Sequence, residues 1–442
     1  MKKTIILLLS LFLFVIVHSQ VSKTIHVITA GTLNSYLKNV NKSTITNITL
    51  TGNIDARDIK MIRDSILNLT VLDVSATTIK EYEGSEGTLS PQTTLYSANE
   101  FPPFSFYNGF ITKASIIKSI LLPNSITSIG ADAFSNCFGL TYIEIPNSVT
   151  IIGDGSFDGC TCLSKISMPN SVKTIGRFAF YKCGLEDLTL PDSVSEIGEY
   201  AFAACTLISN DLVIPTTLSN IGVSTFQSCS GIKGSLVLPN TISVIGENAF
   251  NGCTGFSGGL LIPNSVISIG SHAFFGCTGL TSITIPQSVK SIGSWAFCYN
   301  YKLDSIHANS LEPIDLSSVS GVFKDIDKTS CILYVPLGSA SAYKAAGQWK
   351  DFKNLIEEQV LPLQNLRFID IYPNFVSDKF KINGINEACR ICIFDLNGKV
   401  LLTNEIKPNE YVSINSFAKG EYLVKISTRV GWVTRKILKI EL

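Results

Sequence analysis

One phrase recurs eight times between Leu122 and Asn300, and it constrains the fold more than any other feature of the sequence. Three copies read IPNSVTIIGDGSFDGC, LPNTISVIGENAFNGC and IPNSVISIGSHAFFGC, and they begin at Ile145, Leu238 and Ile262. A repeat of this regularity predicts a stack of similar turns, each of which contacts only its neighbours. Such an architecture directs attention to an exposed surface rather than to an enclosed catalytic pocket.

The copies keep a strict register. Their prolines are 22 to 24 residues apart, and every proline is followed six positions later by Ile, seven later by Gly and eleven later by Phe. Fourteen positions after the proline stands Cys in seven copies and Asn300 in the last. The prolines are Pro123, Pro146, Pro169, Pro191, Pro215, Pro239, Pro263 and Pro286. The cysteines are Cys137, Cys160, Cys183, Cys205, Cys229, Cys253 and Cys277.

Each repeat predicts one short parallel β-strand. Apolar residues alternate with others just before the proline, as in Tyr142-Ile143-Glu144-Ile145, which is the period of a strand with one buried face. Proline ends the strand because it has no N–H for a ladder, and the Asn-Ser that follows suits a turn. We expect the invariant glycine to mark a second corner, where it adopts a backbone conformation closed to other residues. A single unit would expose its Ile, Phe and Leu, so stacking is required.

The repeats resemble the bacterial surface-antigen (BspA-like) type of leucine-rich repeat, whose units read close to I-P-x-S-V-x-x-I-G-x-x-A-F-x-x-C-x-x-L. This resemblance implies a repeat solenoid of leucine-rich-repeat type over residues 110–360. The segment LYVPLGSASAYKAAGQWKDFKNLI, from Leu333 to Ile356, is similar to the closing unit of such arrays. Residues 20–109, with GTLNSYL at Gly31, resemble the capping region that precedes them. Caps are needed because an end turn otherwise exposes its core.

Composition and the N-terminus indicate an exported protein. The chain has 442 residues with 35 basic and 35 acidic side chains, so nothing favours nucleic acid as a partner. Residues 1–19 carry two lysines and an apolar run before Ser19, which predicts a secretory signal peptide. No later apolar run has the roughly 18 residues of a transmembrane segment. We therefore expect residues 20–442 to leave the cytoplasm.

The repeat phrase is absent from residues 365–442, where short alternating strands lie between turn signals. Asn397-Gly398 between two apolar runs predicts a hairpin, and the whole stretch predicts a small antiparallel β-sandwich. IYPNFVSDKFKI, FDLNGKVLL, AKGEYLVKI and RKILKI resemble the C-terminal sorting domain of the type IX (Por) secretion system, although Phe375 stands where that family usually has proline. The resemblance implies transport by the type IX machinery, removal of the domain, and release or attachment at the cell surface.

The residues that could carry chemistry favour a structural reading. Seven of the twelve cysteines share one register, which predicts a buried ladder of reduced thiols. A disulfide among Cys162, Cys298 and Cys331, or to Cys160, remains an alternative. Cys389 and Cys392 lie three apart in a predicted strand and so face opposite sides. The histidines are isolated, and no nucleophile elbow or phosphate loop is present, so we predict no catalytic residues, no metal and no cofactor.

The predicted binding face consists of the positions two and four residues before each proline. Lys165, Asp187 and Asp211 would form one column, in which the two carboxylates lie about 4.8 Å apart, one strand spacing. Val213, Val237 and Leu261 would form a second, apolar column, which is either ordinary strand packing or a stripe for protein contact. The candidate residues are Tyr142, Glu144, Lys165, Asp187, Asp211, Val213, Val237 and Leu261.

These observations predict a non-enzymatic, adhesin-like protein that is secreted or displayed on the cell surface. The resemblance implies that its ligands are extracellular proteins or glycans of a host matrix or of other bacteria. One alternative is a structural surface protein that self-associates through the apolar column. Another is a glycan hydrolase, for which Asp187 and Asp211 would be the acid pair, since their predicted separation approaches that of retaining glycosidases.

Overall fold

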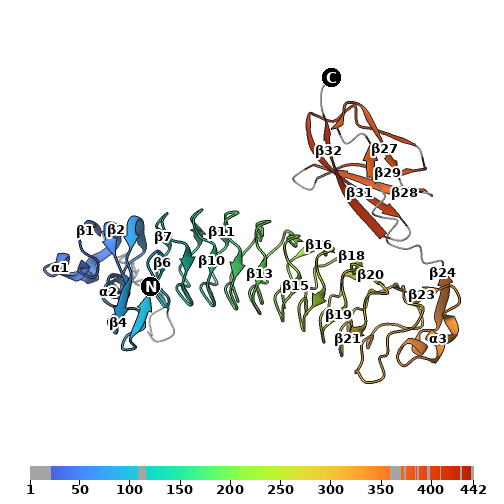
Figure 1. The fold of residues 1–442 in the computed structure, drawn as a ribbon, viewed down its shortest axis with the longest axis horizontal. Helices are drawn as coiled ribbons and strands as arrows, with labels where there is room; N and C mark the ends of the chain where they lie inside the picture. Colours follow the sequence, from blue (N-terminus) through green and yellow to red (C-terminus); the bar gives the residue numbers. More distant parts are fainter. Residues whose placement is uncertain are drawn as a thin grey trace, which may run out of the picture. The chain divides into compact units, whose positions relative to one another are not determined.

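The structure, a computed structural model, describes residues 21–107, 116–358, 370–372, 375–383, 385, 388–395, 399–408, 410–428 and 431–439. The chain folds into two compact units, Met1–Ile208 and Ser209–Leu442. Within each unit, the turns of the repeat array stack in sequence order (Figure 1). The predicted signal peptide at 1–19, the Pro373-Asn374 motif and the Asn397-Gly398 turn lie outside the described residues.

The first unit begins with longer strands than the repeats contain. Four parallel strands form one sheet in the order β1-β2-β3-β7, and two helices pack in its turns. The buried carboxylate of Asp58 accepts backbone hydrogen bonds from Gly31 at 2.6 Å and Leu33 at 2.9 Å, which fixes the first turn to α2. The elements are β1 (Val21–Val27), α1 (Leu33–Tyr36), η1 (Lys42–Thr44), β2 (Ile45–Ile54), α2 (Ala56–Ser65), β3 (Val71–Ile79), β4 (Tyr82–Gly84), β5 (Thr94–Tyr96), β6 (Glu100–Phe101) and β7 (Ser119–Leu121).

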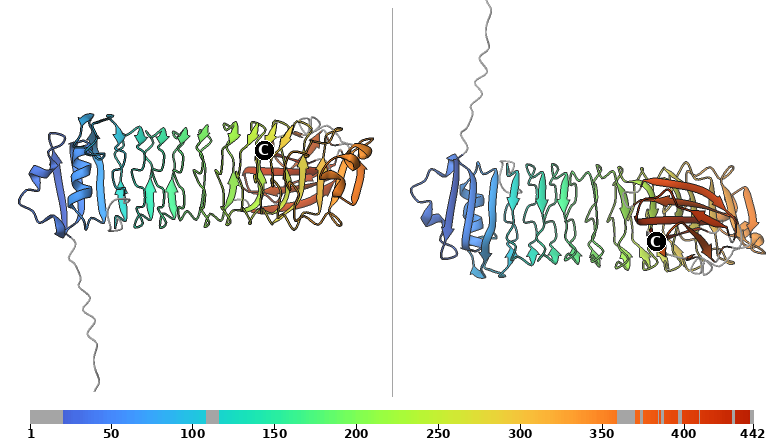
Figure 2. Two further views of the ribbon diagram at one scale, coloured as in Figure 1. Left: turned by 90° about the horizontal axis from the view of Figure 1, so that it is seen from below. Right: turned by 90° about the horizontal axis from the view of Figure 1, so that it is seen from above.

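The repeats of the first unit form the predicted solenoid. The strand before the proline pairs in parallel with the next one, as in β9 (Tyr142–Glu144) and β11 (Lys165–Ser167). Each repeat adds a second, two-residue strand that ends at the invariant Ile, which the sequence did not reveal. The two views in Figure 2 show the strands of this unit side by side. The second strands are β8 (Ser128–Ile129), β10 (Ile151–Ile152), β12 (Thr174–Ile175) and β13 (Glu196–Ile197).

The proline turn is confirmed. The carbonyl of Pro146 accepts a hydrogen bond from the N–H of Val149 at 3.0 Å, and the other seven repeats close the same turn. In this position proline costs the sheet nothing, because its missing N–H lies beyond the end of the strand. The buried valine, isoleucine or leucine three residues on then starts the path to the second strand.

The invariant glycine has a different role from the one predicted. Gly153, Gly176 and Gly270 have ordinary backbone angles, but a Cβ on any of them would lie within 3.0 Å of backbone atoms of the preceding turn. The glycine is therefore required by close approach between turns rather than by a left-handed conformation. The left-handed conformation occurs two and six residues later, at positions where the side chain varies, such as Phe178 (φ 55°) and Lys182 (φ 55°).

The invariant phenylalanines form a column of stacked rings in the core of each unit. In the first unit, the ring of Phe157 lies 5.2 Å from both Phe134 and Phe180, and all three side chains are fully buried. In the second unit, consecutive rings from Phe226 to Phe297 are 5.4 to 5.6 Å apart. The spacing is that of neighbouring turns, so one side chain per turn builds a continuous apolar core.

The second unit contains the rest of the solenoid and its closing turn. Its outer strands are β14 (Asp211–Val213), β16 (Lys233–Val237), β18 (Gly258–Leu261), β20 (Leu280–Ile285), β22 (Ser305–Ala308), β23 (Ile332–Pro336) and β24 (Asn354–Glu358). Its second strands are β15 (Asn220–Ile221), β17 (Val244–Ile245), β19 (Ser268–Ile269) and β21 (Ser291–Ile292). The predicted closing segment supplies α3 (Ala340–Ala345) and η2 (Trp349–Asp351). There Trp349 packs 4.9 Å from the ring of Phe323 and ends the column.

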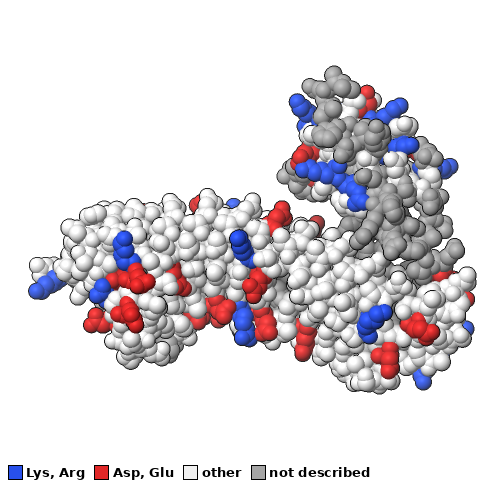
Figure 3. Space-filling view, viewed as in Figure 1, with Lys and Arg blue, Asp and Glu red and all other residues white. Residues whose placement is uncertain are grey.

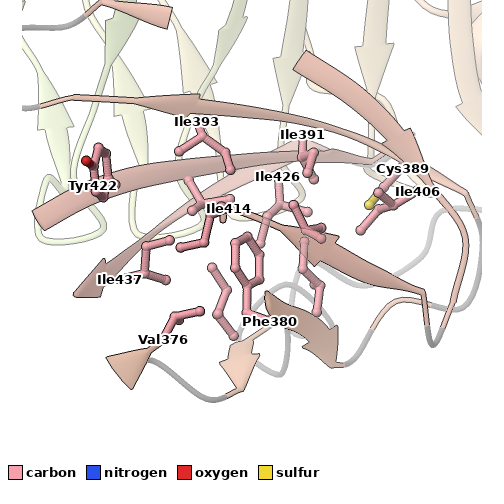
Figure 4. Close-up of a cluster of buried hydrophobic side chains, with 14 of the residues drawn as sticks. Val376, Phe380, Cys389, Ile391, Ile393, Ile406, Ile414, Tyr422, Ile426 and Ile437 are labelled. Carbon is pink, nitrogen blue, oxygen red and sulfur yellow. The ribbon is translucent and has the colours of Figure 1, made fainter. Parts of the chain in front are cut away.

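The C-terminal residues form the predicted β-sandwich of two sheets. The smaller sheet has the order β25-β27-β30, and the larger has β26-β32-β31-β28-β29, in which only the β26–β32 pair is parallel. Figure 4 shows Ile391 and Ile426 of the larger sheet and Phe380 of the smaller pointing into the same buried space. The strands are β25 (Asp370–Tyr372), β26 (Phe375–Val376), β27 (Lys379–Asn383), β28 (Cys389–Phe394), β29 (Val400–Ile406), β30 (Tyr411–Ser413), β31 (Gly420–Thr428) and β32 (Gly431–Lys439).

A buried serine offers a test of the core. Ser156 is fully buried, and its hydroxyl has no hydrogen-bond partner among the described residues. Most other repeats have alanine at this position, as at Ala133 and Ala179. We expect Ser156→Ala to stabilise its turn by about 1 kcal/mol, because it removes an unsatisfied polar group. Slower hydrogen exchange in peptides that contain Phe157 would agree, whereas faster exchange would mean that the hydroxyl is satisfied in solution.

Candidate functional site

The predicted face of the first unit is exposed and charged. Tyr142 and Glu144 project from β9, Lys165 projects from β11, and all three side chains are exposed. Lys165 is the register partner of Tyr142, so the ammonium and the phenol lie on neighbouring strands of one face. Asp187 is also exposed, but it lies in a stretch without strand pairing. These four residues form a mixed polar surface.

Asp211 belongs to the second unit, and its neighbour there is a cation. Its register partner is Lys233 rather than Ser235, the residue that spacing alone would select. The register shifts by two residues here, because β14 advances from Asp211 to Val213 while β16 advances from Lys233 to Val237. The left-handed glycine Gly234 (φ 74°) lies in this bulged stretch. Between β18 and β20 the register shifts by one residue, and the extra residue there is Thr281 of β20. The left-handed Gly258 (φ 78°) lies at this second shift.

Beyond the three residues that we predicted, the outer positions of the following strands carry polar, aromatic and apolar side chains. Val213 is the register partner of Val237, and their side chains are 67% and 42% exposed. Leu261 is half-buried and begins a row of register partners on consecutive strands. We call the whole row the outer strip: Val213, Val237, Leu261, Thr284, His307, Tyr334 and Ile356.

The residues beside the outer strip are small. Gly259, Ser282 and Ser305 are register partners of one another on β18, β20 and β22, and Ser235 holds the corresponding place on β16. Gly234 accepts a backbone hydrogen bond from Ser257 at 2.8 Å, which joins β16 to the next turn. From β16 to β22 the strip is therefore bordered on this side by small, uncharged residues, whereas Asp211 holds the corresponding place on β14. In Figure 3, charged side chains stand in separate groups on the solenoid, and Lys and Arg are frequent on the C-terminal domain.

The far end of the strip is fixed by three side chains. The imidazole of His307 stacks on the ring of Tyr334 with 4.5 Å between the centroids. Its Nδ1 lies 2.8 Å from Oε1 of Glu358. Because Glu358 closes β24, this contact ties the last strand to β22. The sequence offered one signal for this extension, since Tyr334 stands two residues before Pro336 just as Val213 stands before Pro215.

The cysteine ladder is buried, and its thiols do more than fill space. Six of the seven ladder thiols reach the carbonyl of a phenylalanine in the preceding turn, at 3.0 Å for Cys183 to Phe157 and 3.1 Å for Cys277 to Phe250. Asn300 replaces cysteine in the last repeat and donates to Phe274 at 3.0 Å. The ladder is thus a row of hydrogen-bond donors as well as a row of small apolar groups. None of the twelve cysteines forms a disulfide, and Cys162 alone is exposed.

The ladder thiols should resist labelling. Burial raises the pKa of Cys205 to about 12 and holds the pKa of Cys253 well above its usual value, which removes the nucleophilic thiolate at neutral pH. At pH 8 we expect a maleimide to modify Cys162 quickly, Cys392 more slowly, and the ladder only after denaturation. Mass spectrometry of the labelled peptides measures this order. Rapid native labelling of a ladder cysteine would show that the turns open.

Asp187 and Asp211, the predicted acid pair, are both exposed to solvent. The pKa of Asp158 rises to about 6, first because the carboxyl is buried and then because Asp132 is near, but it lies away from the candidate residues, in the turn after Phe157. Among residues 21–107, 116–358 and the described C-terminal segments, no cluster of three His, Cys, Asp or Glu is placed to hold a metal. Nor does that part of the chain contain a helix able to span a bilayer.

Comparison with known families identifies both parts of the chain. The model of the BspA type leucine rich repeat region matches residues 127–257 and 259–326 in six copies. This chain is a BspA-type leucine-rich-repeat protein. The model of the secretion system C-terminal sorting domain matches residues 370–440 of this BspA-type protein. The sorting domain directs it through type IX export to the cell surface or the medium.

Several solved structures of bacterial proteins are similar to parts of this chain. A leucine-rich repeat protein from Bacteroides ovatus is 24% identical, with 61% of this chain and 73% of that chain covered and a TM-score of 0.42. The T. pallidum leucine-rich repeat protein is 26% identical, with 41% of this chain and 72% of that chain covered and a TM-score of 0.31. The pneumococcal vaccine antigen PcpA is 16% identical, with 71% of this chain and 80% of that chain covered and a TM-score of 0.30. A comparison with curated proteins gives no match.

Proposed function

We propose that this protein is a non-enzymatic, adhesin-like surface protein that binds an extracellular protein through the outer strip. The observation that carries the proposal is the row from Val213 to Ile356. Its ends, Val213, Val237 and Ile356, are exposed apolar side chains, and the side chains between them are half-buried. Soluble proteins rarely keep such a contiguous row open unless a partner covers it. Export to the surface places this row where a host-matrix protein or another bacterium can reach it.

The chemistry of the strip favours an uncharged partner surface. Val213, Val237 and Ile356 gain about 25 cal/mol per Å² of apolar area that a partner removes from water. A partner charge placed over Leu261 or Thr284 would lose its hydration without a counter-charge, since the neighbouring positions are Gly259, Ser282 and Ser305. Tyr334 and His307 add an aromatic pair, which is the residue type that dominates binding energy in protein interfaces. A protein ligand therefore fits this face better than an acidic or basic glycan.

Binding to immobilised matrix proteins and to a glycan array tests the proposal. We expect at least one protein to bind the purified secreted protein, with affinity nearly unchanged between 50 and 500 mM salt. Val237→Lys and Ile356→Lys should each weaken that binding at least tenfold, because each places a charge in the strip. Lys165→Glu, on the face of the first unit, is the matched control and should leave binding unchanged. If Lys165→Glu abolished binding while Val237→Lys and Ile356→Lys did not, the strip would not be the binding surface.

The same strip also supports self-association as a second candidate function. Sedimentation of the double variant Val213→Lys/Val237→Lys discriminates between the two. Conversion of an oligomer into a monomer, together with no binding to any panel protein, would favour a structural surface protein. A double variant that sediments like the wild type while losing its ligand would favour the adhesin-like function.

A further inference from the structure

The first strand of the protein leaves one edge of its sheet open. β1 is the terminal strand in the order β1-β2-β3-β7 and pairs with β2 alone. Along Val21–Val27, no backbone hydrogen bond to another described element is formed on the outer side. An open edge of seven residues presents a row of N–H and C=O groups that can pair with another strand.

β1 also has little of the protection that edge strands usually have. It contains no proline and no acidic residue, and Lys23 is its only charged side chain other than the titratable His26. The strand at the other end of the solenoid, β24, carries Glu357 and Glu358 in succession, so two copies of it would repel each other. Consequently the two ends of the array differ, and only the β1 end is suited to pairing with itself.

The sequence of β1 is self-complementary in an antiparallel arrangement. If two copies pair around Thr24, Val21 faces Val27, Ser22 faces His26, and Thr24 faces its own copy. Lys23 then lies opposite Ile25 rather than opposite a second lysine, so no like charges meet. Threonine pairs of this kind are favourable on the face of a sheet. The arrangement is a two-fold, isologous contact.

Exposed apolar side chains lie at the end of the same strand. Ile28 directly follows β1 and is 68% exposed, and Tyr36 of α1 is 42% exposed. The backbone N–H of Ile28 lies 3.4 Å from the hydroxyl of Tyr36, so the two residues are neighbours. They would extend an edge contact beyond the hydrogen-bonded strand.

From these observations we propose that β1 pairs antiparallel with β1 of a second copy of this chain, centred on Thr24, and joins two proteins into a dimer. This contact is separate from the outer strip. A dimer of this kind would present two outer strips instead of one. Avidity gained from two linked sites exceeds the affinity of either one.

Cysteine cross-linking in the purified secreted protein tests the register. In a Cys162→Ser/Cys392→Ser background, Thr24→Cys should give at least tenfold more covalent dimer on mild oxidation than Ser22→Cys. The reason is that antiparallel partners lie about 4.5 to 5.5 Å apart between Cα atoms, which a disulfide spans. Two copies of Ser22 would be four residues apart along the strands, or about 14 Å.

Sedimentation of the unmodified protein gives an independent result. We expect a dimer that Thr24→Pro converts to a monomer, since proline removes an edge N–H and resists pairing, with an unchanged circular dichroism spectrum. The strip variant Val213→Lys/Val237→Lys should remain dimeric, so this test does not depend on the proposed function. A monomeric wild-type protein, or equal cross-linking by Thr24→Cys and Ser22→Cys, would overturn the proposal.

Discussion

Phe157→Ala should destabilise the centre of the first unit by about 3 to 5 kcal/mol, the usual cost of truncating a buried aromatic side chain. Its ring stacks on Phe134 and Phe180 at 5.2 Å on both sides, so the truncation leaves a cavity between two turns that cannot close without shifting the backbone ladder. Hydrogen exchange measures the effect locally, and peptides on both sides of Phe157 should exchange faster. Because each turn contacts only its neighbours, distant turns should change less.

Phe138→Ala is the matched control for this prediction. Phe138 lies in the same unit, but its side chain is 38% exposed and is not part of the ring column. We expect a change of less than about 1 kcal/mol, as for most surface substitutions. Equal effects of the two substitutions would mean that the ring column is not what holds the turns together.

Gly270→Ala should cost roughly 3 kcal/mol, at the upper end of the range for overpacking. An added Cβ would lie 2.5 Å from the backbone N of Glu247 and 2.6 Å from the carbonyl carbon of Gly246, and backbone atoms cannot rotate away as a side chain can. Chemical denaturation followed by the fluorescence of Trp295, which lies in the next turn, should show an earlier transition. The expected cause is separation of two turns rather than backbone strain.

Gly347→Ala separates this cause from the general effect of replacing glycine. Gly347 lies in the same unit, has no left-handed angle, and an added Cβ would meet nothing nearer than 3.8 Å. We expect its denaturation midpoint to match that of the wild type. If Gly347→Ala were as damaging as Gly270→Ala, close approach between turns would not explain the invariant glycine.

The repeat phrase was sufficient to predict the solenoid, the proline turn and the buried cysteine ladder. These features follow from residue chemistry at fixed positions: a missing N–H at Pro146, a ring at Phe157 and a small side chain at Cys160. The paired strands of the C-terminal hairpin, β28 and β29, also form as expected, although its turn lies outside the described residues. Each of these patterns lies within a short stretch of sequence, so the sequence alone was enough to predict the structure that it forms.

Features that depend on neighbouring turns were harder to predict. The predicted role of the invariant glycine was wrong, because the restriction comes from backbone atoms of the preceding repeat. The sequence of a single repeat does not reveal that contact. The left-handed positions escaped notice because Phe178, Lys182 and Trp295 occupy them as readily as glycine does in other repeats. The candidate face stays a prediction, and its named residues end at Leu261. Thr284 and Tyr334 also stand two residues before a proline, whereas His307 and Ile356 do not. Whether Asp187 and Asp211 act together stays a prediction.

The register shifts beside Gly234 and Gly258 separate the length of a repeat from the orientation of its strand. A one-residue insertion in an ordinary strand would turn every outward side chain inward. Here the extra residues of β16 and β20 lie before the outer positions, so Val213 still pairs with Val237 and Leu261 with Thr284. Loops of such an array can therefore be lengthened, and its outer residues exchanged, without redesign of the core. A scaffold with this property is suited to rapid diversification and to the grafting of new recognition surfaces.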